Sequence, residues 1–158
     1  MQCLCREESL EARAKNDVGQ SIPMISDTPV ILKANPEYFM EISGIEKFDD
    51  GSGYRSRLSV STGRFACSDH PFYFDNLKEF AKNLTHAYDK VEGKVRLGHI
   101  YEKDFVEISV LSNGHVTVAG FIVQHGPPHQ EMRFAFECDQ TFLPEMLAAL
   151  KQVNKSLE

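Results

Sequence analysis

The chain has 158 residues, of which 42% are hydrophobic, so it is long enough for one domain with a core and too short for two comfortable ones. Its formal net charge of −6 argues against a nucleic-acid-binding protein, which normally presents a basic face to phosphates. No apolar run approaches the roughly 18 residues needed to span a membrane, and the charged start lacks the apolar segment of a signal peptide. We therefore expect a cytoplasmic protein.

The cysteines are few and unevenly spaced, at positions 3, 5, 67 and 138. They do not form the dense framework of a secreted disulfide scaffold, so we expect reduced thiols. Cys3 and Cys5 follow a C-x-C spacing with no second pair to complete four ligands, and we predict no zinc site.

Residues 1–27 mix charges with scattered apolar positions, which is typical of a flexible N-terminal tail or arm. A single folded domain is expected over residues 28–158. Its first stretches, "PVILKA" and "YFMEISGI", favour β-strands, with Pro36 marking a turn, edge or bulge between them. The run "FDDGSG", residues 48–53, is predicted to be a loop.

A further strand is indicated by alternating apolar residues in "RLSVSTGRFAC". Leu58 and Val60 set the alternation, and Phe65 and Cys67 resume it in a shifted phase. Gly63 is therefore predicted to supply a bulge or turn, with Cys67 pointing inward. The segment "SDHPF" that follows is taken as a loop.

One helix is predicted by apolar residues spaced i, i+3, i+4, i+7 and i+11, which draw a single stripe along a helix face. These residues are Leu77, Phe80, Ala81, Leu84 and Tyr88. Asp75 is the expected N-terminal cap, because its short carboxylate can accept from free N–H groups of the first turn.

The sequence "SVLSNGHVTV" predicts a β-hairpin, because Asn-Gly suits the two positive-φ positions of a type I′ turn. That turn places Ser112 opposite His115. The resulting register pairs Val110 with Thr117, Ile108 with Ala119 and Val106 with Phe121. With "GKVRLGHIY" before the hairpin and "EMRFAFEC" after it, four consecutive strands are expected.

The C-terminal "FLPEMLAALKQV" predicts a second helix, with Pro144 tolerated only in its first turn. Its start is therefore expected near residues 139–141. The whole pattern indicates an α+β domain of order ββ-α-ββββ-α, with a mainly antiparallel sheet of about six strands and both helices packed on one face.

Cys138 and Asp139 lie where the last strand meets this helix, which raises the possibility of a nucleophile. Cys138 shares the parity of Phe134 and Phe136, so we expect it to be an inert thiol in the core. A catalytic cysteine needs a lowered pKa and access for substrate, and the sequence argues for no such access. Asp139 or Thr141 fits a helix cap better than a general acid or base.

Histidines are the remaining candidates for chemistry. The motif "HGPPH" sets His125 and His129 four residues apart, but Gly-Pro-Pro forbids the helix on which such ligands converge. His99 and His115 lie near strand ends, and neither His70 nor His86 is assigned a role. Motifs for a P-loop, a nucleophile elbow and a zinc-binding helix are all missing. We predict no catalytic residues, metal or cofactor.

Several ordered segments resemble the WapI-type family of bacterial immunity proteins over about residues 30–153. They are "YFMEISGIEKFDDGSGYRSRLSVSTGRFAC", "DNLKEFAKNL", "GHVTVAGFIV" and, most specifically, "MRFAFECDQTFLPEMLAAL". The resemblance implies a cytoplasmic protein that is no enzyme and that neutralises the toxic C-terminal domain of a cell-wall-associated YD-repeat (WapA-like) polymorphic toxin, as in contact-dependent inhibition. Its partner would be that toxin domain, by stoichiometric binding, with no nucleic acid or membrane involved.

Partner contacts are expected in loops, which commonly carry binding function on a rigid scaffold. The candidates are Asp49, Asp50 and Tyr54 in the first acidic loop and His125 and His129 in the Pro-rich loop. Solvated loops without a role are an equal alternative for each residue singly. The rival functions are a small cysteine-dependent hydrolase using Cys138 with a histidine, and a stand-alone small-ligand module.

Overall fold

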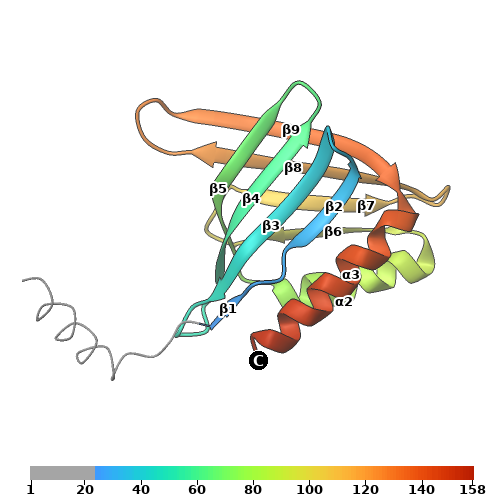
Figure 1. Cartoon of the computed structure of the whole chain (residues 1–158), viewed down its shortest axis with the longest axis horizontal. Helices are drawn as coiled ribbons and strands as arrows, with labels where there is room; N and C mark the ends of the chain where they lie inside the picture. The colour runs from blue at the N-terminus through green and yellow to red at the C-terminus, as the bar shows by residue number, and fades with distance from the viewer. Residues whose placement is uncertain (1–23) are drawn as a thin grey trace, which may run out of the picture.

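The computed structural model describes residues 24–158 (Figure 1). The expected N-terminal arm lies outside the described residues up to position 23, as do Cys3 and Cys5. The arm's last residues join the fold, because the short strand β1 (Met24–Ser26) pairs with β3 and its Ser26 is buried.

Nine strands in the described part of the chain form two antiparallel sheets. The first sheet contains β1, β2 (Val30–Asn35), β3 (Tyr38–Lys47), β4 (Tyr54–Thr62) and β5 (Ala66–Phe74). Both β1 and β2 pair with β3, which continues to β4 and then to the edge strand β5. The second sheet runs in the order β6 (Gly93–Gly98), β7 (Phe105–Val110), β8 (His115–Gln124) and β9 (Gln130–Asp139).

The two sheets lie face to face with their strands crossing, and the helices lie together on one side (Figure 1). Helix α2 (Leu77–Lys90) packs against β6 of the second sheet. Helix α3 (Leu143–Ser156) packs against β2 of the first sheet and against α2. The helix pair therefore joins the two sheets, and one continuous apolar core fills the space between all three layers.

The expected α+β class is confirmed, because the described residues form two α-helices and two sheets whose strands all pair antiparallel. The strands are more numerous than predicted and divide into two sheets. One reason is that "SDHPF", predicted as a loop, lies within β5. Pro71 is tolerated there because β5 is an edge strand, and a bulge at Asp69, whose φ is 52°, interrupts the pairing.

Gly63 supplies the predicted turn, with a φ of 78°, and it separates β4 from β5. Phe65 lies in this turn and is 70% exposed, so it does not continue the apolar alternation. Cys67 is partly buried and packs against the core, as expected.

The β7–β8 hairpin forms, but the predicted turn type and register are wrong. Leu111 N–H donates to His115 O, and Gly114 N–H donates to Leu111 O, which closes a three-residue loop over 112–114. Within this loop only Gly114 has a positive φ, at 84°. Asn-Gly suits this turn as well, because Gly114 readily adopts the left-handed conformation required at the last position of the loop.

The observed register is shifted by one residue from the predicted one. Val110 therefore pairs with Val116, Ile108 with Val118 and Val106 with Gly120. The buried face of the hairpin is then uniformly apolar, whereas the predicted register would have placed Thr117 on it. Gly120 leaves room for the ring of Phe134, its partner on β9. A Cβ at position 120 would also meet Phe105 O at 2.6 Å.

Helix α2 buries the predicted stripe through Leu77, Phe80 and Leu84. Its predicted cap is wrong, because the N-cap residue is Asn76 rather than Asp75, and no side chain caps the helix. The Asn76 amide instead bonds to β6. Its Nδ2 donates to Arg96 O (2.8 Å), and its Oδ1 accepts from Gly98 N (3.2 Å).

The end of the chain follows the prediction. Cys138 is buried on the same face as Phe134 and Phe136. Asp139 caps the short 3-10 helix η2 (Gln140–Phe142) by accepting a hydrogen bond of 2.9 Å from Thr141 N. Helix α3 begins at Leu143, with Pro144 in its first turn.

Candidate protein-binding site

The loop between β6 and β7, residues 99–104, carries the two most exposed large apolar side chains of the described residues. Ile100 is 79% exposed and Tyr101 is 87% exposed. Contiguous exposed apolar surface often marks an interaction site, and these two side chains are neighbours in the chain. We therefore treat this loop, called the 99–104 loop below, as the centre of the candidate site.

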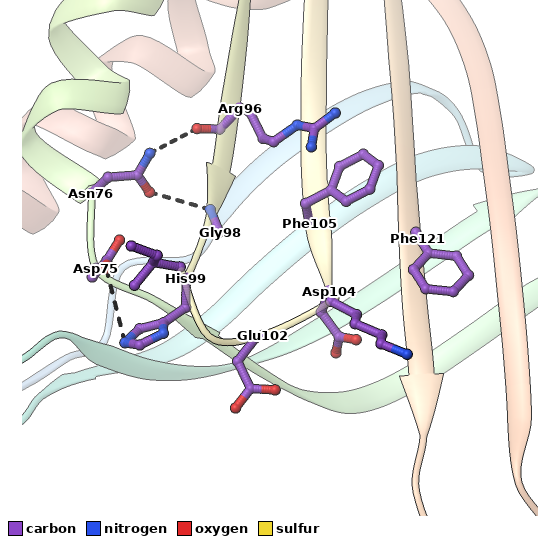
Figure 2. Close-up of a pocket in the computed structure, with 11 residues that line it drawn as sticks. Asp75, Asn76, Arg96, Gly98, His99, Glu102, Asp104, Phe105 and Phe121 are labelled. Carbon is purple, nitrogen blue, oxygen red and sulfur yellow. Dashed lines mark hydrogen bonds and ion pairs between the residues drawn. The ribbon is translucent and has the colours of Figure 1, made fainter.

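The first end of the 99–104 loop is anchored to the start of α2 (Figure 2). Asn76 bridges Arg96 and Gly98 as described, and Asp75 N–H donates to Gly98 O at 3.1 Å. Polar groups of the helix start therefore fix the strand end from which the loop leaves.

His99 shapes the turn itself. Its Nδ1 accepts from Tyr101 N–H at 3.1 Å, and its carbonyl accepts from Glu102 N–H at 3.0 Å. A neutral ring that accepts at Nδ1 carries its proton on Nε2, which faces Asp75 Oδ2 at 3.9 Å (Figure 2). The His99 ring also contacts Tyr101, with ring centroids 5.6 Å apart. Backbone and side chain of Tyr101 are thus both held by His99.

The second end of the loop is anchored by Asp104, a buried carboxylate. Its Oδ2 lies 2.7 Å from His70 Nε2, and its Oδ1 accepts from Val123 N at 3.0 Å. The side chains of His70 and Asp104 are only 11% and 10% exposed. Because His70 belongs to β5 and Val123 to β8, Asp104 ties the loop to both sheets.

A pocket of about 530 Å³ lies beside the loop. Its floor includes Phe105 and Phe121, whose rings lie on neighbouring strands in Figure 2. Arg96 stacks over Phe105, with its Cζ 3.8 Å from the ring centroid, and Arg133 lies over Phe121 at 4.7 Å. The described residues that line the pocket carry imidazole, carboxylate, guanidinium and ammonium groups beside the two aromatic rings.

Comparison with known proteins identifies the family. The model of the "Immunity protein WapI-like family" matches residues 33–157. The chain belongs to the WapI-like immunity protein family. A search of curated proteins found no match. A solved structure titled "Crystal structures of trypanosoma bruciei MRP1/MRP2" is similar at a TM-score of 0.47 and 12% identity, covering 94% of this chain and 92% of that chain.

The match confirms the predicted resemblance, and membership of the family indicates an immunity protein. In the described part of this WapI-like chain, no helix is long and apolar enough to cross a membrane.

The sequence-predicted residues of the first acidic loop differ in exposure. Asp49 and Asp50 are exposed, and hydrogen bonds from Ser52 lower the pKa of the Asp50 carboxyl. Tyr54 is 7% exposed and its ring stacks on Phe74, with centroids 5.4 Å apart. Burial raises the pKa of Tyr54. A ring packed in the core offers little surface to a partner, so Tyr54 supports the loop from beneath.

His125 and His129 lie in the β8–β9 loop, with ring centroids 6.0 Å apart, and His129 Nε2 lies 3.2 Å from Glu131 Oε1. Figure 1 shows this orange loop far from the teal loop between β3 and β4 that carries Asp49 and Asp50. The two predicted segments therefore do not come together.

The 99–104 loop stands between these segments. His125 lines a second hollow, of about 430 Å³, together with Glu102 and Asp104. On the other side, Gly53 of the first acidic loop packs against the backbone of Asp75, where a Cβ would meet Phe74 O at 2.8 Å. Sequence reasoning missed this central loop, because Ile100 and Tyr101 were included in the predicted strand "GKVRLGHIY", whereas β6 ends at Gly98. The charged "EKD" that follows them was the one signal of a loop.

Cys138 has the surroundings of a structural thiol. Burial, and to a lesser extent Asp139, raise its pKa to about 11. A thiol with that pKa is protonated at neutral pH and is a poor nucleophile. Burial and the Asp104 charge also raise the pKa of Cys67. Over residues 24–158, no three His, Cys, Asp or Glu side chains are placed to hold a metal ion.

Proposed function

We propose that this WapI-like protein binds the toxic C-terminal domain of a bacterial polymorphic toxin in the cytoplasm and neutralises it by forming a stoichiometric complex. The match of the family model over residues 33–157 carries the proposal. The exposed apolar pair on an anchored loop adds support, because it is a surface that binding would cover.

Such a complex would protect by covering the surface with which the toxin meets its substrate. The net charge of −6 suits a basic partner surface, of the kind that nucleases present to nucleic acid. Opposite charge raises the rate of encounter more than it raises the final affinity. Charge would thus bring the partners together quickly, and packed side chains would hold the complex.

The direct test is to co-express the chain with the toxin domain encoded beside its gene, scoring cell survival and co-purification of the two proteins. We expect survival together with a one-to-one complex. An unrelated toxin domain of the same chemistry serves as the control and should kill in the presence of the chain. Survival without a complex would indicate an enzymatic antidote and refute stoichiometric neutralisation.

A further inference from the structure

We propose that Ile100 and Tyr101 form the apolar anchor of the complex, inserting into a cleft of the toxin domain whose rim is basic. This inference rests on the proposed function and specifies the surface that performs it.

The exposure of these two side chains is the first support. At 79% and 87% exposed, they have almost all of their apolar surface in water, so a partner that covers them gains nearly the full transfer free energy. Tyrosine is also among the residues that most often dominate binding energy, because a large rigid ring loses little conformational entropy.

The second support is that the loop is held in place before any partner arrives. His99 fixes the Tyr101 backbone and contacts its ring, Asn76 fixes the strand end before the loop, and Asp104 fixes the loop's far end through His70 and Val123. Binding therefore orders little more than two side chains, which removes a main cost of association.

The third support is the charge around the anchor. Asp75 and Glu102 lie beside the pocket, and both are exposed. The first acidic loop, which carries Asp49 and Asp50, packs against the backbone of Asp75 through Gly53. The basic side chains nearby are Lys103 of the loop, Arg96, which pairs with Glu107 at 3.0 Å, and Arg133, which lies over Phe121. Because Glu107 compensates the charge of Arg96, the exposed carboxylates of this surface and of the first acidic loop outnumber the remaining cations, which fits a partner with lysines and arginines around a cleft.

A second copy of the chain fits this surface poorly. In a symmetric dimer the carboxylates around each anchor would face those of the other copy. A toxin cleft with a basic rim avoids this repulsion.

The test measures the affinity of the full chain for the toxin domain in Ile100→Ala/Tyr101→Ala, with Phe65→Ala as the matched control. Phe65 is also a highly exposed apolar side chain in a turn, at 70%, but it lies between β4 and β5. We expect the double variant to bind at least about 30-fold more weakly and the control to stay within about 3-fold of the wild type. Unchanged urea midpoints would show that all three proteins are equally folded.

Several outcomes would overturn the inference. Equal binding by the wild type and the double variant would place the contact elsewhere and leave the proposed function standing. A wild type that neither binds nor protects would refute the proposed function itself. A chain that dimerises as wild type and is monomeric as the double variant would assign the loop to self-association.

A charge-reversal variant tests whether the partner's cleft has a basic rim. Glu102→Lys should slow association about 3-fold or more at low salt and lose that effect at high salt, because steering is screened. Asp89→Lys, an exposed change at the C-terminal end of α2, makes the same change in net charge away from the loop. Equal association rates for the two variants would contradict a basic cleft rim at the 99–104 loop.

Discussion

Replacing Asp104 with alanine should destabilise the fold because this buried carboxylate ties the 99–104 loop to both sheets. The change removes a 2.7 Å contact with His70 and the acceptor of Val123 N–H at 3.0 Å. A hydrogen bond to a charged group contributes about 1.5–3 kcal/mol, and a buried donor without a partner costs about 1–3 kcal/mol. We expect a loss of about 3 kcal/mol in the free energy of unfolding.

Asp104→Asn separates the two contributions, because its amide oxygen can still accept from Val123 N–H. It should lose about half as much stability as Asp104→Ala. Combining Asp104→Ala with His70→Ala in a double-mutant cycle gives the coupling of the pair directly. Asp89→Ala, an exposed carboxylate on α2, is the matched control and should be nearly neutral.

The assay is urea unfolding followed by circular dichroism, because the chain contains no tryptophan to report by fluorescence. The free energy is extrapolated linearly to water, with the slope compared between variants. A loss below about 1 kcal/mol for Asp104→Ala, at an unchanged slope, would refute the reasoning that this side chain holds the loop.

Three further predictions follow from the packing and charge of other residues. Cys138 should react slowly with a thiol reagent at neutral pH. Because folding raises the pKa of this thiol from an ordinary 9.0 to about 11, the free energy of unfolding should fall as the pH rises through this range. The Cys138→Ala variant should lack that part of the fall, and rapid labelling of the native wild type would contradict a buried thiol. Gly120→Ala should destabilise by several kcal/mol in the same urea assay, because its methyl group would collide with the Phe134 ring, and a near-neutral change would contradict this packing. Reversing the charges of Asp49 and Asp50 should slow association with the toxin domain and weaken its salt dependence, and unchanged binding kinetics would remove this loop from the interface.

Local periodicity in the sequence was sufficient to predict the elements that bury a single regular face. The spacing of Leu77, Phe80 and Leu84 predicted α2, and the parity of Phe134, Phe136 and Cys138 predicted the buried face of β9. These predictions are correct because each element buries one face, so its apolar residues recur at the period of a helix or a strand.

Other features depend on interactions that a local pattern does not contain. Asn113 and Gly114 suit two turns that differ by one residue in register, and burial of both Val110 and Val116 decides between them. The edge strand β5 was missed because Pro71 and its neighbours have the composition of a loop. The division into two sheets depends on contacts between distant parts of the chain, which a local pattern does not contain.

The candidate site was the least predictable part of the molecule. His70 and Asp104 are 34 residues apart in sequence and share no motif, so only the packing of the two sheets brings them together. The exposure of Ile100 and Tyr101 likewise follows from where β6 ends against Asn76.

Titration of the toxin domain's activity with the purified chain tests the central claim most directly. At a toxin concentration far above the dissociation constant, stoichiometric neutralisation predicts that activity falls linearly and reaches its minimum at one equivalent of the chain. Loss of activity at a small fraction of an equivalent, growing with time, would show turnover and contradict neutralisation by binding.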